Sequence, residues 1–181
     1  TSRESLSDLG GTGVFATALR EALLADECDL LVHSLKDLPT AAAPGLVIGA
    51  VPKRADARDA LCAREGWTLE TLPEGAKVGT GSPRRVAQLK SVRPDLDVID
   101  IRGNVDTRLG RVAEGDLDAV VLAAAGLGRL GRLEAVTDYF ALSQVPTAPG
   151  QGALALEVRV GGQARRGDVA RALKAVDHAT T

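Results

Sequence analysis

Residues of several chemical types follow one apolar run in the first third of the chain. The segment VHSLKDLPT, residues 32–40, places His33, Ser34, Lys36 and Asp37 where an aliphatic strand is expected to emerge into a loop. An ammonium beside a carboxylate can form an ion pair that only holds the loop in place. Alternatively, Asp37 can meet a ligand that carries N–H groups or developing positive charge, while Lys36 meets an anionic group. The segment therefore predicts either a structural ion pair or a catalytic carboxylate.

The segment GTGSPRR, residues 79–85, has the pattern of a strand that ends in glycines and leads into a helix. Ser82 is expected to cap this helix, with Pro83 at its first position. Arg84 and Arg85 then lie in the first turn, where positive charge opposes the helix dipole unless an anion is close. Backbone N–H groups, a hydroxyl and two guanidiniums suit a carboxylate or a phosphate. The alternative is a solvated basic helix end.

A second basic segment, DIRGNVDTRLGR, spans residues 100–111. Arg102 is expected at the end of a strand, and the carboxyl ends of strands face the ligand crevice in open α/β sheets. Arg108 on the following helix can join it, whereas Arg111 is expected at the surface. The later segment GLGRLG matches a dinucleotide-binding pattern, but the helix after it is too short and no acidic residue follows at the required distance. We therefore expect an anion site and no dinucleotide.

Composition excludes several other classes of protein. The 181 residues are 45% hydrophobic and only 2% aromatic, which favours an aliphatic α/β core. A net charge of -2 argues against a nucleic-acid-coating or membrane-surface protein. Cys28 and Cys62 form no metal-binding pattern, His33 and His178 lack metal-ligand spacing, and no apolar stretch is long enough to span a bilayer. We expect a cytoplasmic protein with no metal site.

The order of the expected elements predicts an α/β fold. Strands and helices alternate at a spacing typical of βαβ units and a mainly parallel sheet. Prolines near residues 51–56 and 145–152 mark two crossings between lobes, with a ligand cleft expected between the lobes. Strands are expected within 28–34, 45–51, 76–82, 96–103, 117–126 and 152–160, and helices within 11–28, 82–92, 104–116, 127–133 and 163–180.

Several segments together resemble the porphobilinogen deaminase family, also called hydroxymethylbilane synthases. They include LLVHSLKDLPT, RDAL, VGTGSPRRVAQL, DIRGNVDTRLGR, DAVVLAAAGLGRLG and PGQGALALEVR, and they cover essentially the whole chain in the family's order. The resemblance implies two periplasmic-binding-protein-like lobes with mainly parallel sheets. Domain 1, residues 1–52 and 153–181, is then incomplete at its amino-terminal side. Domain 2 is residues 53–152, and a third domain is missing after residue 181.

The resemblance also implies a function in tetrapyrrole (heme) biosynthesis. Members of this family are transferases that condense four porphobilinogen units into hydroxymethylbilane, with release of ammonia, on a covalently held dipyrromethane cofactor. By this likeness Asp37 is the catalytic aspartate that stabilises the azafulvene cation formed on deamination. No nucleic acid or membrane is implied as a partner, and the complete enzyme is expected to be a monomer. The positions expected to hold cofactor or substrate are Ser34, Lys36, Thr80, Ser82, Arg84, Arg85, Arg102, Arg108 and Gln151.

The chain departs from the family pattern at two points and in its length. Thr12 stands where the family commonly has a lysine, and Gly81 stands where it has a serine. The cysteine of a GGC motif that anchors the cofactor is expected after residue 181, so this chain alone is expected to be inactive. The alternative function is a two-lobed module that only binds small anions, because a fold of this kind serves both.

Overall fold

The computed structural model describes residues 13–161 and 167–178, and these form two compact units. Unit 1 comprises residues 1–55 and 153–181, and unit 2 comprises residues 56–152. The predicted domain boundary at residues 52 and 53 remains a prediction. Within the described ranges every helix is too short or too polar to cross a lipid bilayer.

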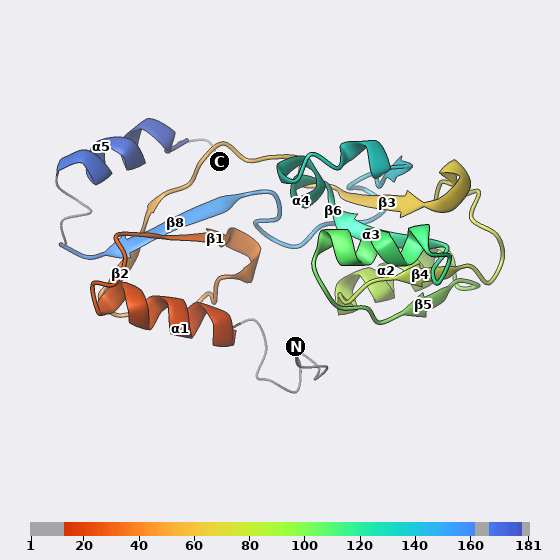
Figure 1. Ribbon diagram of the computed structural model, residues 1–181, viewed down its shortest axis with the longest axis horizontal. Coiled ribbons are helices and arrows are strands. Elements are labelled where there is room, and N and C mark those ends of the chain that lie inside the picture. The colour runs from red at the N-terminus through yellow and green to blue at the C-terminus, as the bar shows by residue number, and fades with distance from the viewer. Residues whose placement is uncertain (1–12, 162–166, 179–181) are drawn as a thin grey trace. The chain divides into compact units, whose positions relative to one another are not determined.

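Unit 1 is a small α/β layer in which helices cover both faces of a sheet (Figure 1). The strands lie in the order β1-β8-β2, and β8 runs antiparallel to both neighbours. Leu23 of α1 packs with Leu31 and Leu46, whereas Leu173 of α5 packs with Val158 in a separate cluster. The elements are α1 (Gly13–Leu24), β1 (Leu31–Ser34), the 3-10 helix η1 (Leu35–Asp37), β2 (Leu46–Ala50), β8 (Leu154–Arg159) and α5 (Gly167–Val176).

Unit 2 is a larger α/β layer of the same kind. Its strands lie in the order β5-β4-β6-β3-β7, with β4 parallel to β5 and β6, and β3 antiparallel to β6 and β7. Its elements are β3 (Asp59–Ala63), η2 (Arg64–Gly66), β4 (Lys77–Gly79), α2 (Pro83–Val92), β5 (Asp97–Ile99), α3 (Val105–Ala113), β6 (Ala119–Ala123), α4 (Ala124–Arg129), η3 (Leu133–Ala135) and β7 (Asp138–Tyr139).

The core of unit 2 lies on both faces of its sheet, as aliphatic strands predict. Alternate residues of β6 point to opposite faces: Val121 packs with Leu89 of α2, and Val120 packs with Leu127 of α4 and Val112 of α3. Helix α2 therefore covers one face, and α3 and α4 cover the other. The basic segments follow the carboxyl ends of β4 and β5. This packing fixes those two strand ends in one sheet.

The predicted α/β class with mainly parallel strands is confirmed, with one feature that the sequence did not reveal. Four of the five strands in the described sheet of unit 2 point the same way, and β3 is the exception. In unit 1 the exception is β8. Each is the first strand after the chain passes from one unit to the other. Neither strand therefore belongs to the regular series of alternating parallel strands and helices.

Candidate functional site

The loop between β4 and α2 presents the first basic segment as the sequence predicts. Ser82 is the N-cap of α2, and its hydroxyl oxygen accepts from the Arg85 backbone N–H at 3.5 Å. Thr80 is buried, and its hydroxyl oxygen accepts from the Ser82 backbone N–H at 3.3 Å. The cap and Pro83 start the helix at a defined residue. The side chains of Arg84 and Arg85 consequently leave the first turn from a rigid base.

Gly81 in this loop lies against the backbone that follows β5. A Cβ atom added at Gly81 would lie 2.6 Å from the carbonyl oxygen of Ile101. That oxygen belongs to the main chain, so it cannot turn aside as the end of a flexible side chain can. A glycine at position 81 therefore allows a close approach of the two loops.

This contact predicts the effect of restoring a serine at position 81. Gly81→Ser forces the two loops apart, and we expect a loss of about 1–3 kcal/mol in the stability of unit 2. Gly110→Ser is the matched control, because an added Cβ at Gly110 meets no atom within 4 Å. Thermal unfolding midpoints of both variants measure the difference. Equal midpoints for the two variants would contradict the close contact.

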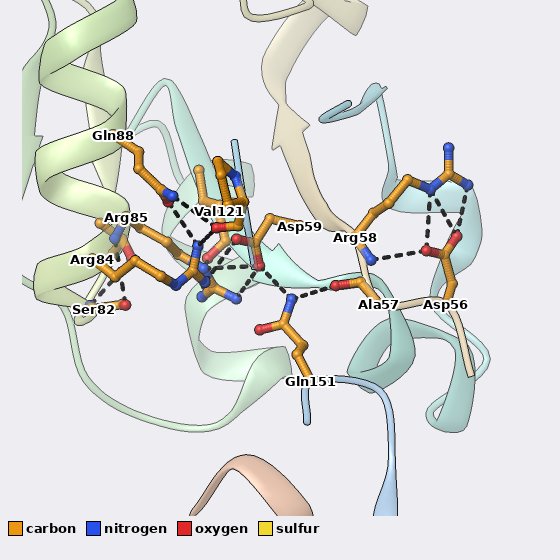
Figure 2. Close-up of polar contacts among 12 residues, drawn as sticks. Asp56, Ala57, Arg58, Asp59, Ser82, Arg84, Arg85, Gln88, Val121 and Gln151 are labelled. Atoms are coloured by element: carbon orange, nitrogen blue, oxygen red, sulfur yellow. Dashed lines mark hydrogen bonds and ion pairs between the residues drawn. The ribbon is translucent and has the colours of Figure 1, made fainter. Parts of the chain in front are cut away.

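Asp59, at the start of β3, is a buried carboxylate that accepts hydrogen bonds from the side chains of Arg84, Arg85 and Gln151 (Figure 2). The Asp59 side chain is 0% exposed, the Arg85 side chain 7% and the Arg84 side chain 25%. Arg85 donates to Asp59 Oδ1 from Nε at 3.0 Å and from Nη2 at 2.6 Å. Gln151 donates to the same oxygen from Nε2 at 2.8 Å. Arg84 donates from Nη2 to Asp59 Oδ2 at 2.8 Å.

Two opposing influences act on the pKa of Asp59. Burial, the largest influence, raises this pKa, but hydrogen bonds and charge from Arg85, with hydrogen bonds from Gln151 and Arg84, outweigh it. The pKa therefore lies below the usual value for an aspartate. Asp59 is consequently a carboxylate at neutral pH, and it neutralises one of the two guanidiniums that it binds.

The lowered pKa of Asp59 predicts how the stability of unit 2 depends on pH. Because folding lowers this pKa, the contribution is complete above about pH 4, the usual aspartate value, and is lost as the pH falls through the lowered pKa. We expect hydrogen-exchange protection of the β3 amides to fall more steeply below pH 4 in the wild type than in Asp59→Asn. Curves of equal slope would contradict an ionised Asp59 in the folded state.

The second basic segment adds positive charge at the end of β5. Arg102 Nη2 lies 3.8 Å from Asp100 Oδ2, and the Arg102 side chain is 36% exposed. Arg108 on α3 donates from Nε to the carbonyl of Gly103 at 2.8 Å. Burial lowers the pKa of Arg108, and the positive charges of Arg85 and Arg102 lower it further, while Asp100 raises it. Arg85, Arg102 and Arg108 thus contribute positive charge to one part of unit 2, where a bound anion would be attracted.

In unit 1 the expected catalytic segment follows β1 directly. Ser34 is half-buried, while Lys36 and Asp37 are exposed on η1. The backbone N–H of Leu35 donates to the carbonyl of Ala153 at 3.0 Å, which ties the start of η1 to the chain before β8. Lys36 and Asp37 therefore stand on a short turn whose first residue is anchored to the sheet.

Polar side chains around the buried Glu157 lie in the same unit. His33, on β1, has Nε2 3.3 Å from Glu157 Oε2. Arg20 of α1 donates to both oxygens of Glu157, from Nε to Oε2 at 3.0 Å and from Nη2 to Oε1 at 2.8 Å. Glu157 is 3% exposed and His33 is 9% exposed. These contacts connect α1, β1 and β8, and His33 is a buried residue of β1.

The structure thus arranges the predicted site residues in two groups. In unit 2, Arg84, Arg85 and Gln151 meet at Asp59, with Thr80 and Ser82 in the adjoining loop. Arg102 and Arg108 follow β5 in the same unit. In unit 1, Ser34, Lys36 and Asp37 lie on consecutive elements, β1 and η1. The approach of Asp37 to the arginines remains a prediction, and Thr12 lies outside the described residues.

Sequence reasoning missed Asp59, although RDAL was among the segments that carried the resemblance. The available signal was an acidic residue that opens the small aliphatic run DALCA, residues 59–63. A charged residue at a strand start is buried only when it is paired. Its natural partners were Arg84 and Arg85, because positive charge in the first turn of a helix calls for a nearby anion.

The residues of unit 2 fit a group that carries several carboxylates. Guanidiniums bind planar carboxylates through paired hydrogen bonds, and Arg102 and Arg84 are partly exposed. Burial, more than the neighbouring charges, lowers the pKa of Arg108, so this guanidinium would gain from a buried anionic partner. A dipyrromethane with acid side chains matches this donor set.

Comparison with solved structures supports the fold. The chain is similar to a periplasmic aliphatic sulphonate binding protein from Escherichia coli, with a TM-score of 0.53 and 17% identity, covering 88% of this chain and 54% of the other. It is also similar to a periplasmic substrate-binding protein of an ABC transporter from Coxiella burnetii, with a TM-score of 0.55 and 13% identity, covering 86% of this chain and 73% of the other. Both likenesses concern the fold alone.

Comparison with protein families and curated proteins is more specific. The family model described as "Porphobilinogen deaminase, dipyromethane cofactor binding domain" matches residues 1–166. The porphobilinogen deaminase of Leifsonia xyli is 78% identical over 100% of this chain and 55% of its own length. That of Thermobifida fusca is 62% identical over 99% of this chain and 55% of its own length. The chain spans about half the length of these relatives, and it belongs to the porphobilinogen deaminase family.

Proposed function

We propose that the complete gene product is a transferase of tetrapyrrole biosynthesis that condenses four porphobilinogen units into hydroxymethylbilane and releases ammonia from each. The observation that carries this proposal is the family match over residues 1–166, which includes Asp37 and every basic residue of the unit 2 site. Because the chain spans about half the length of its relatives, the activity belongs to the complete protein. The 181-residue chain alone is inactive under this proposal.

The arginines bind the acid side chains of the substrate and of the growing product. Each porphobilinogen carries an acetate and a propionate, so every added ring brings two carboxylates. Arg84, Arg102 and Arg108 supply the guanidiniums that recognise them, and bidentate pairing fixes the orientation of each ring. The burial of Arg108, with Arg85 and Arg102 among its charged neighbours, supports this role, since a bound carboxylate would stabilise its charged form.

Asp37 acts on the reacting ring. When ammonia leaves porphobilinogen, positive charge develops on the pyrrole, and a carboxylate close to the ring nitrogen stabilises that charge. The same carboxylate accepts a hydrogen bond from the pyrrole N–H, which orients the ring. The exposed position of Asp37 on η1 leaves its side chain accessible to a ligand. Lys36, beside it, meets a ligand carboxylate.

The dipyrromethane cofactor, when bound, supplies the covalent attachment point on which the four-ring product is built. Several residues of this chain would hold it through its acid groups and the neighbouring loop, namely Ser34, Lys36, Thr80, Ser82, Arg84, Arg85, Arg102, Arg108 and Gln151. Thr80 and Gln151 are buried. Their part is to keep the loop and the arginines in place. A cytoplasmic location and a monomeric state complete the proposal.

The alternative function is a two-lobed module that binds small anions without changing them. The likeness to periplasmic binding proteins fits this alternative, although a shared fold does not determine function. The exposed carboxylate of Asp37 has no evident use in such a module. The family match therefore favours the transferase.

Incubation of the complete gene product with porphobilinogen tests the proposal. We expect one ammonia released for each porphobilinogen consumed and a linear tetrapyrrole as product. The 181-residue chain is the control, and no ammonia is expected from it. Binding of porphobilinogen by the complete protein with no ammonia release would replace the transferase by the anion-binding module.

A further inference from the structure

The two oxygens of Asp59 bind different sets of partners. Oδ1 accepts three hydrogen bonds, two from Arg85 and one from Gln151. Oδ2 accepts one hydrogen bond, from Arg84, among the contacts of the described residues. The second bond of Gln151 Nε2 goes to the carbonyl of Ala57 at 2.7 Å. Asp59 therefore remains paired and hydrogen-bonded when Arg84 leaves it.

Each of the three guanidinium nitrogens of Arg85 donates a hydrogen bond. Its Nη1 donates to the carbonyl of Val121 on β6 at 3.1 Å, while Nε and Nη2 donate to Asp59. Its side chain is 7% exposed. Removing Arg85 from Asp59 would leave the buried guanidinium of Arg85 without its carboxylate, which is costly. Arg85 is thus fixed to the sheet through both β3 and β6.

Arg84 is held more loosely, although it belongs to the same helical turn. Its side chain is 25% exposed, and its Nη1 donates to the carbonyl of Pro146 at 2.8 Å and to Gln88 Oε1 at 2.7 Å. Figure 2 shows Arg84 and Gln88 extending from α2 toward the same place, with Asp59 beyond. A neutral amide and a backbone carbonyl are weaker partners than a carboxylate. A ligand carboxylate can therefore replace these two partners of Nη1, and Asp59, which keeps its three other hydrogen bonds, can release Nη2 as well.

The balance of charge also distinguishes Arg84 from Arg85. Asp59 neutralises one guanidinium, and two are bound to it. Once Arg85 is matched to Asp59, the charge of Arg84 is the one in excess. An entering carboxylate would gain most by pairing with Arg84, because the Asp59 and Arg85 pair is already satisfied.

We propose that Asp59 is a positioning residue for ligand binding: it fixes Arg85 and Gln151 through Oδ1 and holds Arg84 through Oδ2, so that Arg84 is the arginine that passes to a ligand carboxylate. This inference rests on the proposed function. Asp59 does not touch the ligand, and it acts through Arg84. It thereby divides the two adjacent arginines into a fixed one and an exchangeable one.

Kinetics of the complete gene product with porphobilinogen test the role of Asp59. Asp59→Asn keeps the shape of the side chain but removes its charge, so Arg84 and Arg85 repel each other and lose their common anchor. We expect KM to rise roughly tenfold or more, and kcat to change less than about threefold, because no reacting atom loses a contact. Asp59→Glu keeps the charge, so its KM should lie closer to that of the wild type.

The matched control is Asp56→Asn, which removes a carboxylate three positions away. Asp56 pairs with Arg58, and the two side chains are 37% and 43% exposed. A KM within about twofold of the wild type is expected for this variant, since exposed ion pairs contribute little. A purely structural role for Asp59 would reduce the fraction of active protein, and hence the apparent kcat, without moving KM. An unchanged KM in Asp59→Asn would overturn the inference.

Crystal structures of the complete protein with and without porphobilinogen test the exchange directly. With the ligand bound, we expect Arg84 Nη2 to lie on a ligand carboxylate and away from Asp59 Oδ2, while both Arg85 bonds to Asp59 remain. Departure of Arg85 from Asp59, or retention of Arg84 on Asp59, would overturn the inference. A wild-type protein that consumes no porphobilinogen would instead overturn the proposed function, whereas normal turnover with an unmoved Arg84 would reject only the role of Asp59.

Discussion

Asp37→Asn is expected to reduce porphobilinogen consumption by the complete gene product roughly 10²–10³-fold. The asparagine side chain has nearly the same shape and still accepts a hydrogen bond from a pyrrole N–H. It carries no charge, so it cannot stabilise the positive charge that develops when ammonia leaves. Attachment of the cofactor should be partly retained, because the residues expected to hold the acid groups are unchanged. Initial rates of ammonia release, together with the mass of the purified variant, measure both effects.

Asp29→Asn is the matched control for this prediction. Asp29 is an exposed aspartate in the loop before β1, so the change has the same chemistry in the same unit. Its rate should equal that of the wild type. If Asp37→Asn consumed porphobilinogen as fast as Asp29→Asn does, Asp37 would have no catalytic role.

The largest effect on stability is expected from Asp59→Leu. This change leaves the buried guanidinium of Arg85 without its carboxylate, and breaking such a pair costs about 3–5 kcal/mol. The double variant Asp59→Leu with Arg85→Met leaves no buried charge unpaired, so it should be more stable than the single variant. Hydrogen exchange of the β3 amides reports the unfolding free energy of unit 2 separately from the rest of the protein.

Asp56→Leu provides the comparison at an exposed ion pair. Its partner Arg58 is 43% exposed, and pairs of this kind contribute about 0–1 kcal/mol. A cost for Asp59→Leu as small as that for Asp56→Leu would show that the Asp59 network does not stabilise unit 2. A double variant less stable than Asp59→Leu would show that Arg85 contributes chiefly by packing.

Sequence patterns predicted most helices and the aliphatic strands, because burial of one helix face leaves a helical period and burial of both strand faces leaves a short continuous apolar run. Helix α2, from Pro83 to Val92, lies where Ser82 and Pro83 predict its start. The short helix α4 begins at Ala124, three residues before the predicted range. The segment AAAG can continue a strand or begin a helix, and the packing of Ala124 and Leu127 in the core decides between them.

Strand β3 was missed because its residues have little strand preference. Asp59, Ala60 and Ala63 are of types that are rare in strands, and only the pairing with β6 and β7 makes the segment extended. The direction of a strand also leaves no trace in its apolar pattern. The antiparallel course of β3 and β8 therefore emerged only from the structure.

The candidate site was predictable as far as local patterns reach. The cap at Ser82, the arginines in the first turn of α2 and the exposed Asp37 after β1 each follow from a few neighbouring residues. The pairing of Arg84 and Arg85 with Asp59 joins residues that lie 25 and 26 positions apart. Contacts between residues so far apart in the chain are set by how β3 joins the sheet, and no local pattern encodes them.

The intact mass of the complete gene product tests the central claim most directly, because the family's chemistry requires a covalently attached dipyrromethane. Purified under denaturing conditions, the protein should exceed the mass of its polypeptide by one two-ring adduct. The Asp59→Asn and Asp37→Asn variants, measured in parallel, show whether attachment depends on either residue. A wild-type mass equal to that of the polypeptide alone, in protein that also releases no ammonia from porphobilinogen, would contradict the account.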